Sequence, residues 1–261
     1  MRVPIFQLDA FAHRRFTGNP AAVMALPAYP DDDALQAMAA ENNLAETAFL
    51  KAEGDDYAIR WFTPTMEVPL CGHATLASAA VVMEYLETGR TDVVFHSISG
   101  PLPVRRTNDG YAMDFPARPC GEVALPDGMA EALGIIPQAV FAHPLNYLCL
   151  LKSVAEVERL TPDMAAIARL DRSGVIVTAR GAGVHDFVSR YFAPAKGIPE
   201  DPVTGGAHCM LAPFWAKRLG KTEFRAWQAS KRGGEILCRL RADRVELEGR
   251  VVFYMRGEAE I

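Results

Sequence analysis

The sequence predicts an α+β protein of two related, pseudo-symmetric domains, each a mixed, mostly antiparallel sheet rolled around a central helix. The first observation is a repeat: the stretch from Arg60 to Pro69 returns 130 positions later as Arg190 to Pro199, with an arginine, an aromatic residue, a phenylalanine and two prolines in register. One copy in each half of the 261-residue chain indicates a duplicated unit. The second observation is that strand-like stretches outnumber helical ones, with few strand–helix–strand units.

The first half begins with two strands around the turn Phe16-Thr17-Gly18-Asn19-Pro20, which is rich in residues that interrupt regular structure. Asp31-Asp32-Asp33 then provides an N-cap and first-turn acids for a helix that ends near Asn43. The helix that follows Gly72 is almost entirely apolar as far as Tyr85, which is typical of a buried helix. The strands predicted in this half cover residues 5–11, 21–26, 47–50, 58–62, 93–98 and 111–115.

The best candidate for a domain boundary is Pro116-Ala117-Arg118-Pro119, because two prolines in four residues end strand pairing. The predicted domains are therefore residues 1–115 and 116–261, with the C-terminal strand able to return to the first domain. The helices predicted in the second half cover residues 127–134, 153–159, 162–170 and 204–219. Its predicted strands cover residues 147–151, 175–178, 187–192, 224–227, 235–240, 244–247 and 251–254.

Composition favours a small-molecule partner. The chain has a net charge of −5 and a pI near 5.7, which argue against a nucleic acid or an anionic membrane as the main partner. Its five cysteines are odd in number and lack CxxC spacing, so neither a disulfide framework nor a thiolate metal site is expected. With a strand-like N-terminus and no apolar leader, the sequence predicts a cytoplasmic protein.

The two motif copies also predict an anion site. Each copy ends in a helix, and helix N-termini present unpaired N–H groups and a positive dipole end. The alignment makes Cys71 and Asp201 equivalent positions before the two helices, on opposite sides of one cleft, where each side chain can carry a proton. We therefore expect a carboxylate to bind near Gly72, His73, Gly205 and Gly206.

Five segments carry a resemblance to a known family. The sequence resembles the PhzF-like phenazine-biosynthesis isomerases and, more distantly, diaminopimelate epimerase. This resemblance implies a homodimer and a cofactor-independent isomerase that moves a proton within a small carboxylate-bearing substrate bound between the two domains. The matching segments are Phe16 to Val23, Glu41 to Phe49, Leu70 to Thr75, Glu200 to Gly205 and Gln228 to Gly234.

The resemblance also implies roles for individual residues. Glu46 matches the catalytic glutamate, and His73 and Asp201 match residues that assist proton delivery. The residues that it assigns to substrate binding are Asn19, Gly72, Gly205, Gly206 and Gln228. Relatives commonly have serine at the position of Gly206, so any role for that hydroxyl is absent here.

Other interpretations stay open for these residues. Glu46 alone would be taken for a solvated strand end, and Asp201 for the N-cap of the helix at 204–219. His73 at a helix N-terminus is expected to be a neutral imidazole that donates to developing negative charge.

The role of cysteine separates the alternative functions. Cys71 is either a packed thiol or, in an epimerase or racemase, a proton-transfer group. His208-Cys209 is expected to pack in the core rather than bind zinc, and no metal site is predicted. A third interpretation is a non-catalytic small-molecule-binding member of the fold.

Overall fold

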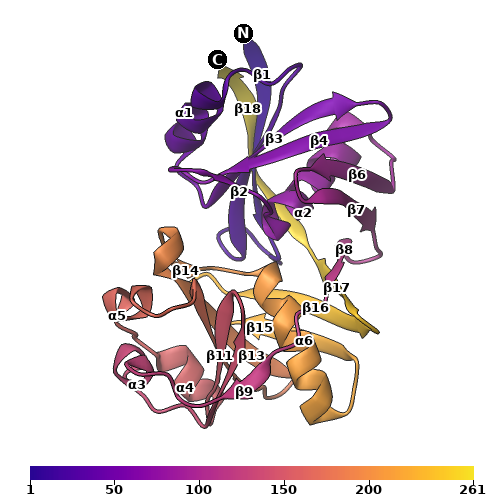
Figure 1. Ribbon diagram of the computed structural model, residues 1–261. Coiled ribbons are helices and arrows are strands. Elements are labelled where there is room, and N and C mark those ends of the chain that lie inside the picture. Colours follow the sequence, from indigo (N-terminus) through magenta and orange to yellow (C-terminus); the bar gives the residue numbers. More distant parts are fainter. The chain divides into compact units, whose positions relative to one another are not determined.

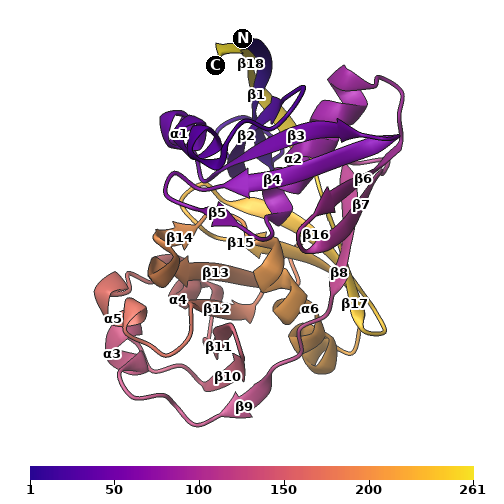
Figure 2. The same cartoon turned by 45° about the horizontal axis from the view of Figure 1, so that its top comes forward.

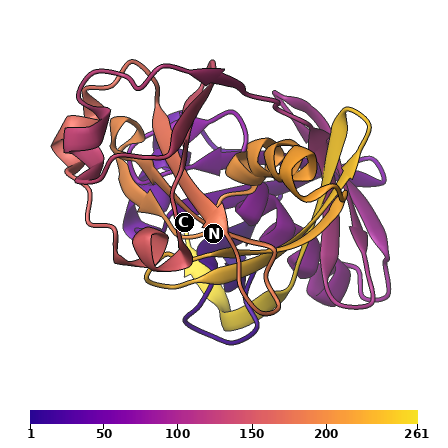
Figure 3. The same ribbon diagram turned by 90° about the horizontal axis from the view of Figure 1, so that it is seen from below.

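A computed structural model describes all residues, Met1–Ile261, and its internal contacts divide the chain into two compact units. Unit 1 comprises Met1–Asp114 and Glu248–Ile261, and unit 2 comprises Phe115–Leu247 (Figure 1). The predicted boundary lies one residue after this one. The C-terminal strand of unit 1 pairs with its first strand, and the two termini lie side by side in Figure 3.

Unit 1 is a mixed sheet around one buried helix. Strand β1 pairs antiparallel with β18 and β2, β2 pairs parallel with β3, β3 antiparallel with β4, β4 parallel with β6, and β7 antiparallel with β6 and β8. Helix α2 lies against β2 and β3 (Figure 2), and nine of its ten residues are buried. The elements of unit 1 are β1 (Arg2–Ala10), β2 (Asn19–Ala25), α1 (Asp32–Asn42), β3 (Glu46–Glu53), β4 (Asp56–Phe62), β5 (Glu67–Val68), α2 (Gly72–Val81), a π-helical turn (Val82–Leu86), β6 (Asp92–Ser97), β7 (Gly100–Arg106), β8 (Tyr111–Pro116) and β18 (Val251–Glu260).

Unit 2 repeats this plan around helix α6. Strand β10 pairs antiparallel with β9 and β11, β11 parallel with β12, β12 antiparallel with β13, β13 parallel with β15, and β15 antiparallel with β16. Strands β8 and β17 run across the boundary between the units. The elements of unit 2 are β9 (Gly121–Val123), α3 (Met129–Leu133), β10 (Ala139–His143), β11 (Asn146–Leu150), α4 (Val154–Arg159), α5 (Met164–Ala168), β12 (Gly174–Arg180), β13 (Phe187–Ala193), a 3-10 turn (Pro194–Lys196), β14 (Ile198–Asp201), α6 (Gly205–Leu219), β15 (Glu223–Gln228), β16 (Gly234–Arg241) and β17 (Arg244–Gly249).

The repeated motif forms the same local structure in both units, which confirms the predicted pseudo-symmetry. In unit 1 the Arg60 guanidinium donates to both carboxylate oxygens of Glu67 at 2.7 Å and lies over the Phe62 ring. In unit 2 Arg190 binds Glu200 at 2.7 and 2.9 Å and lies over Phe192. Such two-bonded pairs fix the geometry of a planar guanidinium. The arginine therefore fastens the strand to the loop that leads into the central helix.

The expected equivalence of Cys71 and Asp201 is wrong by three residues. The N-cap of α2 is Cys71, whereas the N-cap of α6 is Thr204, and Asp201 lies at the end of β14. The 3-10 turn before β14 makes the second copy of the motif longer than the first. An alignment of the two copies on their arginines and prolines is therefore out of register by the time the central helices begin. Thr204 is thus the counterpart of Cys71.

The expectation of few strand–helix–strand units is also wrong. Each of the parallel pairs β2–β3, β4–β6, β11–β12 and β13–β15 has at least one helix in its connection. Parallel strands need a crossover, and here several of the crossover helices are short. Strands β7 and β14 were missed because they contain prolines. In β7, Pro101 and Pro103 pair with β6, while the pairing with β8 starts at Val104. No helix of the protein is long and apolar enough to cross a lipid bilayer.

Candidate active site

Two neighbouring strands place Asn19 and Glu46 on one face of the unit 1 sheet. Glu46 pairs with Ala21 across the parallel strands β2 and β3, and Asn19 lies two residues before Ala21 on the same side. Gly18 makes the turn into β2 possible, because its φ is +67° and a Cβ there would lie 2.2 Å from the Ala10 carbonyl oxygen. Asn19 is fully buried and Glu46 is 9% exposed.

The N-terminus of α2 brings His73 and Cys71 to the same place. His73 Nε2 lies 3.1 Å from Glu46 Oε2, in ion-pair contact but without the alignment of a hydrogen bond. His73 Nδ1 lies 3.1 Å from Asn19 Nδ2 and 3.4 Å from Cys71 Sγ. The imidazole thus lies between a carboxylate and a thiol. Glu46 Oε2 and His73 Nε2 are both buried, and each atom has the other as a polar neighbour at 3.1 Å.

The neighbours of His73 favour its protonated form. Burial lowers the pKa of His73, but contacts with Cys71 and Glu46 outweigh burial and raise that pKa well above its ordinary value. We attribute the rise to Glu46, because a carboxylate is ionised at neutral pH and the Cys71 thiol is not. The prediction of a neutral imidazole held by the helix dipole is therefore wrong, since a charge at 3.1 Å acts more strongly than a dipole end.

Cys71 is a protonated thiol at neutral pH. Burial, and then the charge of Glu46, raise the pKa of Cys71 to about 11. A thiolate is the reactive form of cysteine, so this environment opposes a role as base or nucleophile.

The donor atoms of Glu46, Cys71 and His73 lie within 4.8 Å of one another, a spacing that a metal ion could use. However, His73 directs Nδ1 to the sulfur and Nε2 to the carboxylate. The lone pairs of the two ring nitrogens point apart, so one ion cannot bind all three groups unless the imidazole turns. The observed arrangement fits a chain of proton carriers better than a metal centre.

The predicted site residues of unit 2 gather around the start of α6. The fully buried Gln228 accepts from Thr204 N–H at 2.9 Å and donates to the Asp201 carbonyl at 2.7 Å and Thr204 Oγ1 at 3.2 Å. Asp201 Oδ2 accepts from Thr204 Oγ1 at 2.6 Å. The N-cap of α6 is therefore Thr204 and not Asp201, whose side chain binds the hydroxyl of the N-cap residue.

The structure thus forms two sets of predicted residues. Asn19, Glu46, Gly72 and His73 come together in unit 1, where Gly72 is the first residue of α2. The members in unit 2 are Asp201, Gly205, Gly206 and Gln228. Thr204 was not singled out as a site residue, although its place after Asp201-Pro202-Val203 was a signal for a helix start.

The pair His208-Cys209 lies in the core, as expected. Both side chains are buried, and His208 Nδ1 donates to the Thr204 carbonyl at 2.8 Å. Burial lowers the pKa of His208 to about 4, so the ring is neutral at physiological pH.

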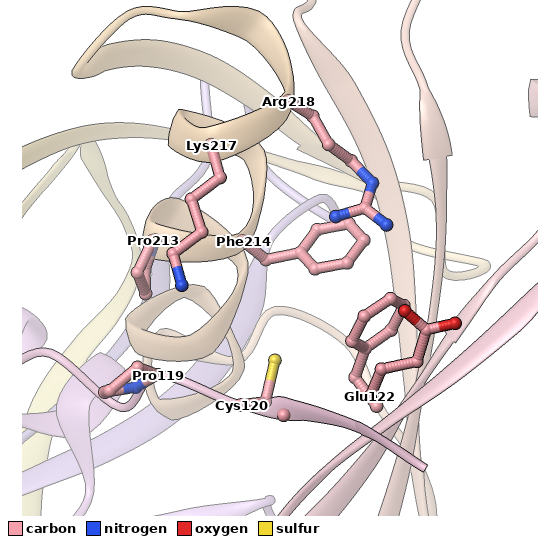
Figure 4. Close-up of a pocket in the computed structure, with 9 residues that line it drawn as sticks. Pro119, Cys120, Glu122, Pro213, Phe214, Lys217 and Arg218 are labelled. Carbon is pink, nitrogen blue, oxygen red and sulfur yellow. The ribbon is translucent and has the colours of Figure 1, made fainter. Parts of the chain in front are cut away.

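A pocket of 260 Å³ on unit 2 is separate from these residues. Figure 4 shows Arg218 beside the Phe214 ring, whose centroid is 4.0 Å from the guanidinium carbon. The pocket is lined by Pro119, Cys120, Gly121, Glu122, Phe141, Pro213, Phe214, Lys217 and Arg218. None of the predicted site residues lines it, so we do not place the reaction there.

Comparisons with known proteins agree with this architecture. The sequence profile of the phenazine biosynthesis-like protein family, PhzC-PhzF, matches residues 8–257. A Pseudomonas aeruginosa protein named as an uncharacterized isomerase is 49% identical over 257 residues, with 98% of each chain covered. The crystal structure of a PhzF-family protein from Enterococcus faecalis matches with a TM-score of 0.97 and 42% identity over 100% of both chains.

A more distant match supports the fold alone. The crystal structure of a hydroxyproline epimerase from Agrobacterium vitis matches with a TM-score of 0.65 and 12% identity, covering 98% of this chain and 92% of the other. The two-unit fold, the matching profile and the identity to full-length relatives together show that the chain belongs to the PhzC-PhzF family of phenazine biosynthesis-like proteins, which includes proteins named as isomerases.

Proposed function

We propose that the protein is an isomerase that moves a proton within a small carboxylate-bearing substrate, with Glu46 as the base. The observation that carries this proposal is the buried contact between Glu46 and His73, in which Oε2 and Nε2 are 3.1 Å apart. A catalytic base must reach the proton that it abstracts.

In the proposed reaction Glu46 Oε2 takes a proton from a carbon next to a conjugated or carboxyl group. The electron pair of the broken C–H bond passes into that group, and a proton returns to a different carbon, so that no electrons are gained or lost. His73 supports both steps, because its protonated ring stabilises the carboxylate before transfer and can release a proton afterwards. The positive ring also offers a partner for negative charge that develops on the substrate.

Asp201 is proposed as the acid that assists the return of the proton. Its side chain accepts a hydrogen bond from Thr204, and Gln228 holds its backbone carbonyl. We assign Gln228 a positioning role, since its amide groups bind the protein itself. That the substrate lies between the two units, that no cofactor is needed and that the protein is a cytoplasmic homodimer remain predictions. Light scattering on the purified protein tests the dimer.

One observation favours a second function, that of an amino-acid epimerase. Cys71 Sγ lies 3.4 Å from His73 Nδ1, so a thiol and a carboxylate flank the same ring. With the pKa of Cys71 raised to about 11, its thiol would act as the acid and not as the base. This version predicts inversion at one carbon, whereas the isomerase moves the proton to another carbon.

The test is incorporation of solvent deuterium. Small unsaturated carboxylates and α-amino acids are incubated with the protein in D₂O and followed by proton NMR. Deuterium at a new carbon supports isomerisation, and deuterium at the original stereocentre with racemisation supports the epimerase. A compound that binds without exchange in the wild type, and equally well in Glu46→Gln, would refute both and leave a binding protein.

A further inference from the structure

The pocket of 260 Å³ on unit 2 lies where the first segment of this unit passes along α6. Pro213 has no N–H, so the carbonyl of Cys209, four residues earlier, lacks its usual helical partner. The backbone N–H of Arg118 donates to that carbonyl at 2.9 Å and fixes the segment against the helix. The next two residues, Pro119 and Cys120, therefore form one wall of the pocket.

The opposite side of the pocket is apolar and belongs to the interior of unit 2. Phe141 on β10 and Phe214 on α6 are both buried, and their ring centroids lie 5.0 Å apart with an interplanar angle of 69°. Pro213 beside them is buried too, and all three residues line the pocket. A cavity of about 150 Å³ with apolar walls is enough for a benzene ring. This larger pocket thus has room for an aromatic ring that carries one small group.

Two positive side chains of α6, Lys217 and Arg218, also line the pocket. Each follows an apolar lining residue, Pro213 or Phe214, by four positions, so helical spacing brings them to the same face of α6 (Figure 4). The Arg218 guanidinium carbon lies 4.0 Å from the ring centroid of Phe214 and 4.9 Å from that of Phe141. No ion pair engages Lys217 or Arg218. The protein therefore leaves both charges without a carboxylate.

The lining of the pocket has one positive charge in excess. One acid, Glu122, lines the pocket together with the two cations Lys217 and Arg218. Burial raises the pKa of the half-buried Cys120 thiol, while the charges of Lys217 and Arg218 lower it. Both positive charges therefore act at the wall of the pocket. One excess positive charge is complementary to a ligand with a single negative charge.

We infer that this pocket is a second small-molecule site, which binds an aromatic monocarboxylate with its ring against Phe141 and Phe214 and its carboxylate at Lys217 and Arg218. A guanidinium suits a carboxylate, since its planar N–H groups match both oxygens. The lining residues all belong to unit 2, and none of them is a residue of the candidate active site. This site therefore does not depend on the proposed function.

Cys120 provides a local reporter, because it is the one cysteine of the chain that is not buried. In the first test the full-length protein is labelled with the neutral disulfide 4,4′-dithiodipyridine, and the labelling rate is measured with and without benzoate. Benzoate should slow the labelling of Cys120, whereas neutral benzamide should not. Cys120→Ser should lose this labelling phase, which assigns it to the pocket.

The double variant Lys217→Gln/Arg218→Gln tests the two cations. Its affinity for benzoate should fall about tenfold, which corresponds to about 1.4 kcal/mol. Both side chains are exposed, so the variant should fold. The matched control Lys152→Gln/Arg159→Gln removes two exposed positive charges elsewhere in unit 2 and should leave the affinity unchanged. Protection is the ratio of the labelling rates with and without benzoate, so a change in the reactivity of the thiol itself cancels.

Cys120→Phe tests the space of the pocket without a change of charge. Figure 4 shows the Cys120 sulfur pointing toward α6, so the new ring would occupy the place of the ligand. The variant should keep its melting temperature. In NMR titrations the Gly121 amide should shift with benzoate in the wild type and not in Cys120→Phe.

The possible outcomes decide the inference. Equal protection by benzoate and benzamide, or protection that persists in Lys217→Gln/Arg218→Gln, would overturn the carboxylate site. Absence of protection up to the solubility limit of benzoate would do the same. If labelling slows when the protein concentration is raised without benzoate, another copy of the chain covers the pocket and the inference is wrong. Glu46→Gln should keep full protection, whatever its effect on deuterium exchange.

Discussion

Replacing Gln228 with methionine should detach the loop that carries Asp201 from the start of α6. Methionine has nearly the same length and shape, so the change removes the amide and little volume. In the protein this amide accepts from Thr204 N–H and donates to the Asp201 carbonyl, in a position that is fully buried. Both backbone groups lose their partners in Gln228→Met, while the bond from the Thr204 hydroxyl to Asp201 can persist.

The expected cost follows from these two groups. A buried polar group left without a hydrogen bond costs about 1–3 kcal/mol, and because Thr204 and Asp201 are half-buried the free energy of unfolding should fall by about 2–3 kcal/mol for the two groups together. The free energy of unfolding of a typical domain is about 5–15 kcal/mol, so this loss is a large part of it. Gln36→Met is the matched control, because half-buried Gln36 donates one bond, to the Thr63 carbonyl at 2.9 Å. Its loss should cost about 1 kcal/mol.

Urea denaturation followed by circular dichroism measures both changes, and amide hydrogen exchange at Thr204 reports the local effect. Gln228→Met should expose the Thr204 amide to faster exchange and lower the rate of deuterium incorporation into substrate. Equal stability losses in the two variants, with an unaltered Thr204 amide, would refute the positioning role of Gln228.

Three further results are expected. Glu46→Gln should slow deuterium incorporation about 10²-fold or more, the usual scale of general acid–base catalysis, while Cys71→Ser should have a small effect; a large loss in Cys71→Ser would favour the epimerase. NMR titration should find the pKa of His73 above its ordinary value in the wild type, and a lower pKa of His73 in Glu46→Gln. The stabilisation of the folded protein by the His73–Glu46 pair should therefore be complete below about pH 6.5 and be lost as the pH rises through the folded-state pKa of His73. The pKa of His208 is lowered to about 4, so neutral His208 should contribute about 3 kcal/mol to the free energy of unfolding above pH 6.5, and this contribution should be lost as the pH falls toward 4. If His208→Phe loses stability in acid to the same extent, this expectation is wrong.

Much of the fold could be predicted because it is encoded in local pattern. The 130-residue repeat from Arg60 to Arg190 identified the duplication, and the apolar stretch after Gly72 identified a buried central helix. The run Asp31-Asp32-Asp33 was predicted to supply an N-cap, and the Asp31 side chain does accept from the Ala34 N–H. These features depend on spacing along the chain and on the chemistry of single residues, which are visible without coordinates.

Contacts between distant segments could be decided only by the tertiary structure. The identity of Glu46 and His73 as candidate residues came from motifs, but the 3.1 Å contact between them depends on a parallel strand pair and a helix that meet in space. That contact reverses the expected charge preference of His73, because a neighbouring carboxylate outweighs the helix dipole.

The same limit explains the error at Asp201. The prediction placed Asp201 directly before α6 from the arginine and proline register of the internal repeat, but a 3-10 turn makes the second copy longer and the helix is capped by Thr204. Nor does any spacing along the chain indicate that the Arg118 N–H binds the Cys209 carbonyl, which Pro213 leaves without a helical partner. The residue types and the repeat are properties of the sequence itself, whereas charge interactions depend on distance, and distances between segments far apart in the chain exist only once it is folded.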